Sequence, residues 1–113
     1  YGGAFPLWLA PVQVAIIPVA DRHLDYAHQL ESDLKMDGFR VQVDSRSERV
    51  NLKIRSAQME KVPYMLVIGD KEVSGSCLSV RLRTGEQASD IPTRDFKETL
   101  KSLVRDKSIA LKL

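Results

Sequence analysis

The segment Tyr64-Met65-Leu66-Val67-Ile68 is an unbroken run of five apolar residues that ends at Gly69. Such a run predicts a β-strand that is buried on both faces, as at the centre of a parallel sheet. Val12 to Val19 has the same nearly continuous apolar character. Phe39 to Val43 alternates apolar with polar residues, which is typical of a strand with one buried face. These three segments are the predicted centre of the fold.

Helical patterns separate the three strands. Apolar residues recur at helical spacing from Leu24 to Leu34, between Asp21, which can cap a helix, and Gly38, which can end one. Ser47 can cap a second helix, which we expect to end near Pro63. This alternation of strands and helices predicts parallel strands joined by right-handed crossovers, with helices on both faces of the sheet.

The last part of the chain adds strands and a final helix. We expect Asp70 to Ser76 to form a turn or a short extended piece, followed by a half-exposed strand from Leu78 to Leu82. Thr84 to Ile91 is a polar connection with room for one short edge strand. Thr93 can cap a final helix whose apolar residues from Phe96 to Val104 share one face. The predicted class is α/β, with the order β-α-β-α-β-β-α.

The composition sets limits on the function. With 113 residues the chain fits one domain, and its 43% apolar and 28% charged residues are ordinary for a soluble globular protein. A formal net charge of only +2 means that nucleic-acid binding would depend on the clustering of cations. Cys77 is the single cysteine, which excludes an internal disulfide and fits a reducing compartment. No apolar run is long enough to cross a bilayer, and the first residues do not resemble a signal peptide.

Several familiar kinds of site lack the residue spacing that they require. His23 and His28 are five residues apart, so they do not share a helix face as two metal ligands would. The glycines match neither a dinucleotide-binding nor a phosphate-loop pattern, and no serine lies in a Gly-x-Ser-x-Gly turn. We therefore predict no metal site and no nucleophilic catalytic residue.

Cations gather around the predicted start of the second helix, at Arg46, Arg49, Lys53 and Arg55. Arg49 and Lys53 are four residues apart and share a helix face, and a helix N-terminus attracts phosphate through its free N–H groups. This pattern is typical of contacts with the backbone of a nucleic acid. A solvated helix face is the alternative interpretation and stays open.

Arg81 and Arg83 are predicted on one face of a strand, near the acidic residue Glu72. A carboxylate can accept hydrogen bonds from the N1–H and N2–H₂ groups of guanine, and an arginine can donate to base acceptors. Unpaired bases expose these edges, so the three residues favour a single-stranded RNA loop as the ligand. A surface ion pair between Glu72 and Arg81 is the alternative.

Three acids follow predicted strands and suggest a different class of function. Asp21, Asp44 and Asp70 would meet at one rim of the sheet, as a phospho-acceptor or magnesium site requires. That alternative describes a flavodoxin-like enzyme or nucleotide binder, although acids at these places also serve as helix caps and turn residues. A protein-interaction domain is a further alternative, and it would expose an apolar patch.

Six segments of the chain form a pattern that is known from one family. They are Phe5-Pro6-x-Trp8-Leu9-Ala10-Pro11-Val12-Gln13, Asp44-x-Arg46-x-Glu48, Lys53-Ile54-Arg55, Pro63-Tyr64-Met65-Leu66-Val67, Gly69-Asp70-Lys71-Glu72 and Val80-Arg81. Together they closely resemble the C-terminal anticodon-binding domain of the threonyl-tRNA synthetases, from about Gly3 to Val104. The prolyl-, histidyl- and glycyl-tRNA synthetases share mainly the Ala-Pro opening and the Asp-x-Arg turn.

The resemblance implies a three-layer α/β/α sandwich around a five-stranded mixed sheet with one antiparallel strand, and a role in reading the anticodon of threonine tRNA. Glu72 takes the position of the family's guanine-reading glutamate, and Arg81 that of its base-contacting arginine. Ser47 stands where the family carries a base-reading asparagine. With this shorter hydroxyl the contact is either lost, mediated by water or taken over by Asn51, which replaces a family glycine. The residues expected to contact the RNA backbone or to support the site are Arg46, Arg49, Lys53, Arg55, Lys71 and Arg83.

The same resemblance divides the chain and places it in a larger protein. Residues 1–11 are expected to be a connector after a catalytic domain, residues 12–107 the anticodon-binding domain, and residues 108–113 a tail. The fragment is then a non-catalytic monomer without cofactor or metal, and it binds no membrane. The parent is expected to be a cytoplasmic, dimeric threonine–tRNA ligase that uses ATP, magnesium and a zinc ion of its catalytic domain. The alternative parents are prolyl-, histidyl- or glycyl-tRNA synthetases, or a free-standing paralogue.

Overall fold

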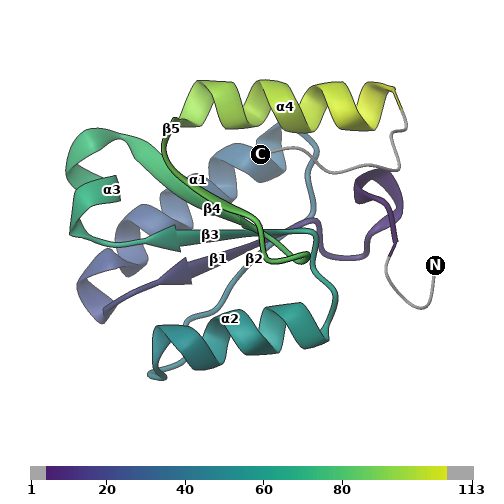
Figure 1. Cartoon of the computed structure of the whole chain (residues 1–113). Helices are drawn as coiled ribbons and strands as arrows, with labels where there is room; N and C mark the ends of the chain where they lie inside the picture. The colour runs from purple at the N-terminus through teal and green to yellow at the C-terminus, as the bar shows by residue number, and fades with distance from the viewer. Residues whose placement is uncertain (1–4, 107–113) are drawn as a thin grey trace.

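The computed structural model describes residues 5–106, which fold around a five-stranded mixed sheet (Figure 1). The strands are β1 (Val14–Pro18), β2 (Val41–Val43), β3 (Tyr64–Ile68), β4 (Cys77–Leu82) and β5 (Gln87–Pro92), in the spatial order β2-β1-β3-β4-β5. β1 pairs in parallel with β2 and β3, whereas β4 is antiparallel to both β3 and β5. The expected mixed sheet with one antiparallel strand is therefore confirmed.

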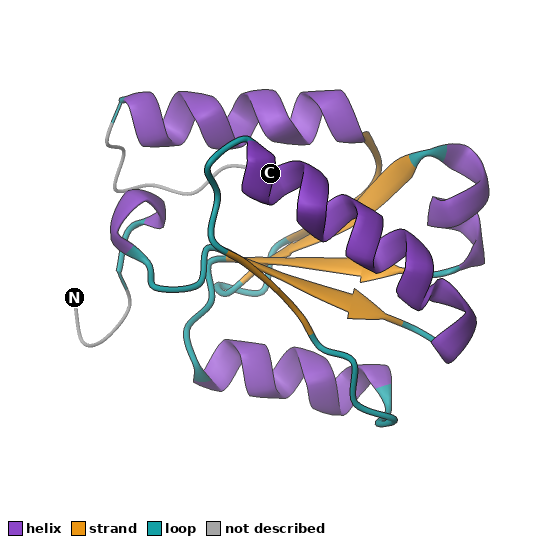
Figure 2. Cartoon of the chain, turned by 180° about the vertical axis from the view of Figure 1, so that it is seen from behind, coloured by secondary structure: helices purple, strands orange, loops and turns teal. Residues whose placement is uncertain are grey.

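Helices cover both faces of this sheet and complete the expected three-layer sandwich. They are α1 (Leu24–Met36), α2 (Val50–Met59), α3 (Asp70–Gly75) and α4 (Thr93–Arg105), with short 3-10 helices η1 (Leu7–Leu9) and η2 (Asp21–His23). α1 and α4 lie on one face and α2 lies on the other, as Figure 2 shows from behind. α3 is a short connection between β3 and β4 at the end of the sheet (Figure 1).

Strand β1 shows why two helical layers are needed. Its five residues are all buried, and alternate side chains point to opposite faces of the sheet. Val14 and Ile16 belong to the larger core, which includes residues of α1 and α4, and there the rings of Tyr64 and Phe96 meet edge to face with centroids 5.6 Å apart. Ile17 points the other way into a smaller core with Ile54 of α2.

The smaller core does not extend across the whole sheet, because α2 packs mainly on β1. On β4, Leu78, Val80 and Leu82 are buried toward α1 and α4, whereas the residues between them are only partly buried. This alternation confirms the predicted half-exposed strand. Its polar members, Ser79 and Arg81, lie on the same side of the sheet as α2.

The prediction of a turn or extended piece at Asp70 to Ser76 is wrong, because these residues form helix α3. Glu72 turns back to accept a hydrogen bond from the Gly69 N–H, which satisfies a donor at the start of the helix. Ser76 then ends the helix in a left-handed conformation, with φ of 51°. A helix of six residues is too short to produce an apolar period that the sequence could show.

The three predicted side-chain caps are also wrong. Asp21 lies inside the first turn of η2, Ser47 precedes α2 by three residues, and Thr93 is the first residue of α4. None of α1, α2 and α4 has a side-chain hydrogen bond at its N-cap. The Thr93 hydroxyl instead donates to the carbonyl of Ser76, 3.4 Å away, so a contact between elements has replaced the local one.

The segment before β1 packs onto the domain. Leu7 is fully buried in the larger core, and its carbonyl accepts a hydrogen bond from the Gln13 side chain at 2.9 Å. Arg40 donates to the carbonyl of Ala10 at 2.8 Å. The described part of the expected connector is thus attached to the fold, while residues 1–4, Lys107 and the expected tail at residues 108–113 lie outside the described residues.

Candidate nucleic-acid interface

A groove opens on the α2 side of the sheet, where α2 leaves β4 and β5 uncovered. Its volume is about 460 Å³. The residues that line this groove, named here the Arg81 groove, are Val50, Asn51, Ile54, Val67, Ser79, Val80, Arg81, Gln87, Ala88 and Ser89. The wall from α2 contributes the amide of Asn51, and the floor from β4 contributes the guanidinium of Arg81. The lining therefore offers both donors and acceptors to a ligand.

Arg81 is the main cation of this groove. It lies in β4 opposite Met65 of β3 and Gln87 of β5, and it is partly exposed. Its guanidinium makes no hydrogen bond or ion pair with another residue between positions 5 and 106. The expected alternative, a surface ion pair with Glu72, is thus not formed in this part of the chain.

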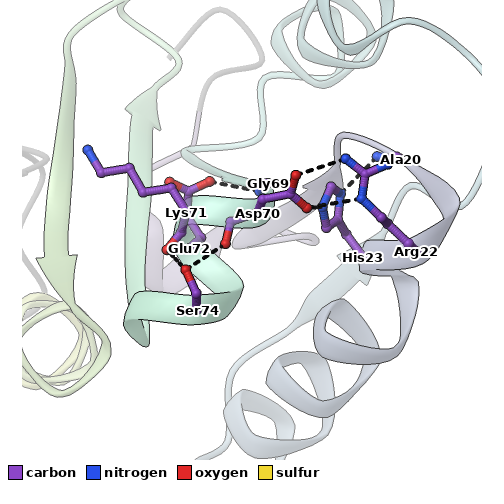
Figure 3. Close-up of polar contacts among 8 residues, drawn as sticks. All are labelled: Ala20, Arg22, His23, Gly69, Asp70, Lys71, Glu72 and Ser74. Carbon is purple, nitrogen blue, oxygen red and sulfur yellow. Dashed lines mark hydrogen bonds and ion pairs between the residues drawn. The ribbon is translucent and has the colours of Figure 1, made fainter.

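Glu72 is placed by the start of α3 and by β4 (Figure 3). Its side chain is only 7% exposed. One carboxylate oxygen, Oε1, accepts from the Gly69 N–H at 2.7 Å, and the other, Oε2, accepts from the Ser79 hydroxyl at 3.2 Å. Each carboxylate oxygen can accept a second hydrogen bond, so acceptor capacity remains for a ligand. Because Ser79 and Arg81 share a face of β4, Glu72 is connected to the edge of the Arg81 groove.

Gly69 permits this arrangement of Glu72. A Cβ atom at position 69 would lie 3.2 Å from Oε1 of Glu72, closer than an ordinary van der Waals contact. Any larger residue there would press on the carboxylate. The glycine therefore allows the close approach of the carboxylate, and its own backbone angle is not an unusual one.

The loop between β2 and α2 carries several of the predicted cations. Arg46 binds the carboxylate of Asp44 with two hydrogen bonds, at 2.9 and 2.7 Å, and this pairing lowers the pKa of Asp44. Ser47 is exposed and lines a second hollow of about 440 Å³ together with Arg49 and the turn after β1. This hollow and the Arg81 groove lie on either side of the start of α2. Asn51 of α2 lines the Arg81 groove, and Arg49, which directly precedes α2, lines the second hollow.

Lys53 is not on a solvated helix face, which was the alternative interpretation of the sequence. It is 5% exposed, and its ammonium donates to the carbonyls of Pro18 and Asp44, each 3.2 Å away. Pro18 is the last residue of β1 and Asp44 directly follows β2, so Lys53 joins two strand ends to α2 from inside. Arg49 and Arg55, in contrast, are exposed and available to a phosphate.

Two further predicted residues are engaged within the fold. Lys71 forms an ion pair with Asp90 of β5 at 2.9 Å, which raises the pKa of Lys71. Arg83 lies beyond the end of β4 and donates to the carbonyl of Phe5 at 2.5 Å, and burial lowers its pKa. Arg83 is thus placed at the segment before β1, and Lys71 at α3, rather than beside Arg81.

Sequence reasoning missed a set of contacts between η2 and α3 (Figure 3). Arg22 donates two hydrogen bonds to the carboxylate of Asp70, at 3.0 and 2.9 Å. The Nε2 atom of His23 lies 2.6 Å from the same carboxylate, and the two contacts hold the pKa of Asp70 far below its usual range. Because the partners are 48 and 47 residues apart, no local pattern indicates that they meet.

Two of the three acids of the enzyme alternative have partners of their own. Asp44 binds Arg46 and Asp70 binds Arg22 and His23, while Asp21 is exposed in η2. Between residues 5 and 106, no three His, Cys, Asp or Glu side chains are grouped so that they could hold a metal ion. Over the same range, no helix combines the length and the apolar character needed to span a membrane.

Comparisons with known proteins give a consistent result. Residues 13–103 match the family described as "Anticodon binding domain". Threonine–tRNA ligase of Dehalococcoides mccartyi strain CBDB1 is 52% identical over 108 residues, which is 96% of this chain and 18% of that protein. The corresponding ligase of Thermotoga neapolitana is 46% identical over the whole chain and 18% of its own length.

A solved structure is also similar. The RNA binding domain of threonyl-tRNA synthetase from Cryptosporidium parvum has a TM-score of 0.76 and 30% sequence identity. The likeness covers 99% of this chain and 27% of that one. The chain therefore spans about a fifth of the length of the curated relatives that it matches.

Proposed function

The chain belongs to the anticodon binding domain family, and from this premise we propose that it recognises the anticodon loop of threonine tRNA on behalf of a longer threonine–tRNA ligase. The proposal is supported by relatives that are themselves threonine–tRNA ligases. In this role the chain is a recognition module, and aminoacylation belongs to the rest of the longer protein.

The observation that carries the proposal is the arrangement of Glu72 beside the Arg81 groove. Two donors, the Gly69 N–H and the Ser79 hydroxyl, fix the plane of the Glu72 carboxylate before any ligand arrives. A fixed carboxylate can accept both the N1–H and the N2–H₂ of one guanine, and a nearby arginine can donate to base acceptors. Glu72 is the proposed guanine reader, and Arg81 the proposed contact to a base in the groove.

The start of α2 is the proposed second contact region. The exposed Ser47 and the groove-lining Asn51 present a hydroxyl and an amide on either side of it, and either can bond a base edge. Arg49 and Arg55 are the proposed phosphate contacts because they are exposed. Arg46, Lys53, Lys71 and Arg83 are proposed to support the site through the contacts described above.

The remaining expectations concern the longer protein. ATP, magnesium and zinc are proposed for its catalytic domain. The partners proposed for this chain are threonine tRNA and that catalytic domain. Residues 12–107 are the proposed anticodon-binding unit, and a cytoplasmic location, a monomeric fragment and a dimeric parent complete the proposal.

Fluorescence anisotropy with a labelled threonine anticodon stem-loop at low salt tests this function. A second loop carries adenine in place of the middle anticodon guanine, and loops from proline, histidine and glycine tRNAs test the other synthetases. We expect the guanine-containing threonine loop to bind most tightly. Equal affinity for the guanine and adenine loops would contradict the proposal, because binding would then be electrostatic only.

The variant Glu72→Ala tests the role of the carboxylate. We expect it to lose about 1–3 kcal/mol of binding free energy for the guanine loop and little for the adenine loop. Glu98→Ala, which removes an exposed acid from α4, is the control for the change of charge. If Glu72→Ala weakened both loops by the same factor, the base-reading role of Glu72 would be wrong.

A further inference from the structure

Helix α3 holds the proposed guanine reader, yet it cannot set its own position. It has six residues, fewer than two turns, and a helix so short is unstable without tertiary contacts. Its contacts come from two sides. Lys71 binds Asp90 of β5, and Asp70 binds Arg22 and His23 of η2, as Figure 3 shows for the second side.

The second side is the more firmly built, because His23 is buried. His23 is 2% exposed, and its Nδ1 atom lies 3.1 Å from the N–H of Ala20, which can only donate. The Nδ1 atom is therefore the acceptor, and the proton of a neutral ring is on Nε2. The Nε2–H then donates to Asp70 at 2.6 Å, so the backbone of η2 orients the ring and the ring orients Asp70.

Asp70 in turn fixes the groups that hold Glu72. It is the first residue of α3, directly after Gly69, whose N–H binds Glu72 at 2.7 Å. A rotation of this first turn would move the Gly69 N–H and the Glu72 side chain relative to Ser79 on β4. The plane of the carboxylate thus depends on contacts that are made on the far side of α3.

We propose that Arg22, His23 and Asp70 form a positioning clamp that holds α3 in the orientation from which Glu72 distinguishes guanine from adenine. The clamp rests on the proposed function and adds three positioning residues to it, none of which needs to touch RNA. A change in the clamp is expected to reduce discrimination between bases while the protein stays folded.

Two substitutions of His23 separate the two hydrogen bonds of the ring. His23→Gln places an amide N–H near the former Nε2 and can still donate to Asp70. His23→Asn places an amide oxygen near the former Nδ1, so it keeps the bond to Ala20 but cannot reach Asp70. We expect His23→Gln to keep the guanine-to-adenine affinity ratio, and His23→Asn to reduce it by about tenfold.

Asp70→Ala tests the clamp from its exposed side, where a substitution leaves no cavity, since the Asp70 side chain is 71% exposed. Its matched control is Glu31→Ala, because Glu31 also binds a histidine and a cation, His28 and Lys35, but on α1. We expect Asp70→Ala to reduce the affinity ratio and Glu31→Ala to leave it unchanged. In a Glu72→Ala background, Asp70→Ala should cause no further loss of the ratio.

A readout without RNA keeps the clamp and the proposed function separate. Hydrogen exchange of the Gly69 amide, followed by NMR, should become faster in His23→Asn and in Asp70→Ala but not in His23→Gln. Unchanged exchange in all three variants would overturn the clamp. So would an equal loss of affinity for both loops, because that indicates a structural role alone. A wild-type protein that failed to discriminate would overturn the proposed function, while the exchange rates would still report on the clamp.

Discussion

At the scale of single residues, two charged side chains occupy buried positions, which charged residues rarely take. Glu72 and Lys53 are 7% and 5% exposed. A buried charge is costly unless it is hydrogen-bonded, and both are. Glu72 has the Gly69 N–H and the Ser79 hydroxyl, while Lys53 has two backbone carbonyls. The difference is that the Glu72 carboxylate can still accept hydrogen bonds from a ligand beside the Arg81 groove, whereas the Lys53 ammonium stabilises the fold.

Lys53→Met should therefore destabilise the protein. The substitution leaves the carbonyls of Pro18 and Asp44 without their donor, and each buried acceptor left unsatisfied costs about 1–3 kcal/mol. Because two acceptors lose their donor, we expect a loss of at least that size in the free energy of unfolding, measured with urea. Arg55→Met, an exposed change on the same helix, is the control and should have little effect. Unchanged stability together with weaker binding of every RNA would instead support a direct phosphate contact by Lys53.

At the scale of elements, the fold places its shortest helix at the proposed reading position. α1 and α4 each have thirteen residues and bury an apolar face, but α3 has six and buries only Glu72. Asp70 and Lys71 connect it to η2 and β5 through ion pairs, and Glu72 connects it to β4 through Ser79. Such ties between exposed charges depend on pH and salt, unlike apolar packing.

The tie through Asp70 predicts a dependence of stability on acid. The pKa of Asp70 is lowered in the folded protein by Arg22 and then by His23. Its contribution to stability is therefore complete above about pH 4, the pKa of an unfolded aspartate, and is lost as the pH falls toward the folded value. We expect the melting temperature of the wild type to fall more steeply below pH 4 than that of Asp70→Asn.

Thermal melting followed by circular dichroism at several pH values measures this difference. The wild type should melt at a higher temperature than Asp70→Asn at neutral pH, and the two should converge in strong acid. Glu98→Gln changes an exposed acid of α4, and its melting temperature should vary with pH in the same way as that of the wild type. Parallel curves for Asp70→Asn and the wild type would contradict a stabilising role of the ion pair.

At the scale of the whole molecule, cations lie on both faces of the sheet, and those around α2 are on the side of the Arg81 groove. The formal net charge is +2. Arg46 and Arg49 precede α2 and Arg55 lies within it, while α4 carries Arg94, Lys97, Lys101 and Arg105. α4 occupies the opposite face of the sheet (Figure 1). An RNA loop in the Arg81 groove would meet the cations near α2, while α4 would face solvent or another part of the longer protein.

This distribution predicts how binding depends on salt. Each phosphate contact to a single strand contributes about 0.7 to the slope of log affinity against log salt concentration. This slope is negative, and the double variant Arg49→Gln, Arg55→Gln should therefore make it less steep by about 1.4 without changing the preference for guanine. The control pair Arg94→Gln, Arg105→Gln on α4 should leave the slope as it is. A slope that became equally less steep in both pairs would indicate only a general effect of net charge.

Sequence reasoning was strongest for the elements with long apolar patterns. The predicted strand at Tyr64 to Ile68 has the observed bounds of β3, and the helix around Leu24 to Leu34 is α1. It failed where structure depends on contacts between elements. The cap at Thr93 was wrong because its hydroxyl donates to the Ser76 carbonyl instead, and the extended piece at Asp70 to Ser76 was wrong because α3 is held by contacts with η2, β4 and β5.

The candidate site divides in the same way. Residue types alone pointed to Glu72 and Arg81 as a pair that suits a base, and to arginines around α2 as phosphate contacts. Their surroundings could not be inferred, since the burial of Lys53 and the lack of an ion pair between Glu72 and Arg81 follow from the packing of α2 and α3.

The amino-acid sequence by itself determined the α/β class, the order of the elements apart from α3, and the apolar residues of the core, because side-chain periodicity is a local property that folding preserves. Only the tertiary structure decided which charged residues are exposed and which form hydrogen bonds or ion pairs within the fold. Arg22 and His23 meet Asp70 across almost fifty residues of chain because parallel crossovers bring the ends of β1 and β3 together at one rim. Hydrogen bonds between such distant residues depend on distance in space, which the linear sequence does not specify.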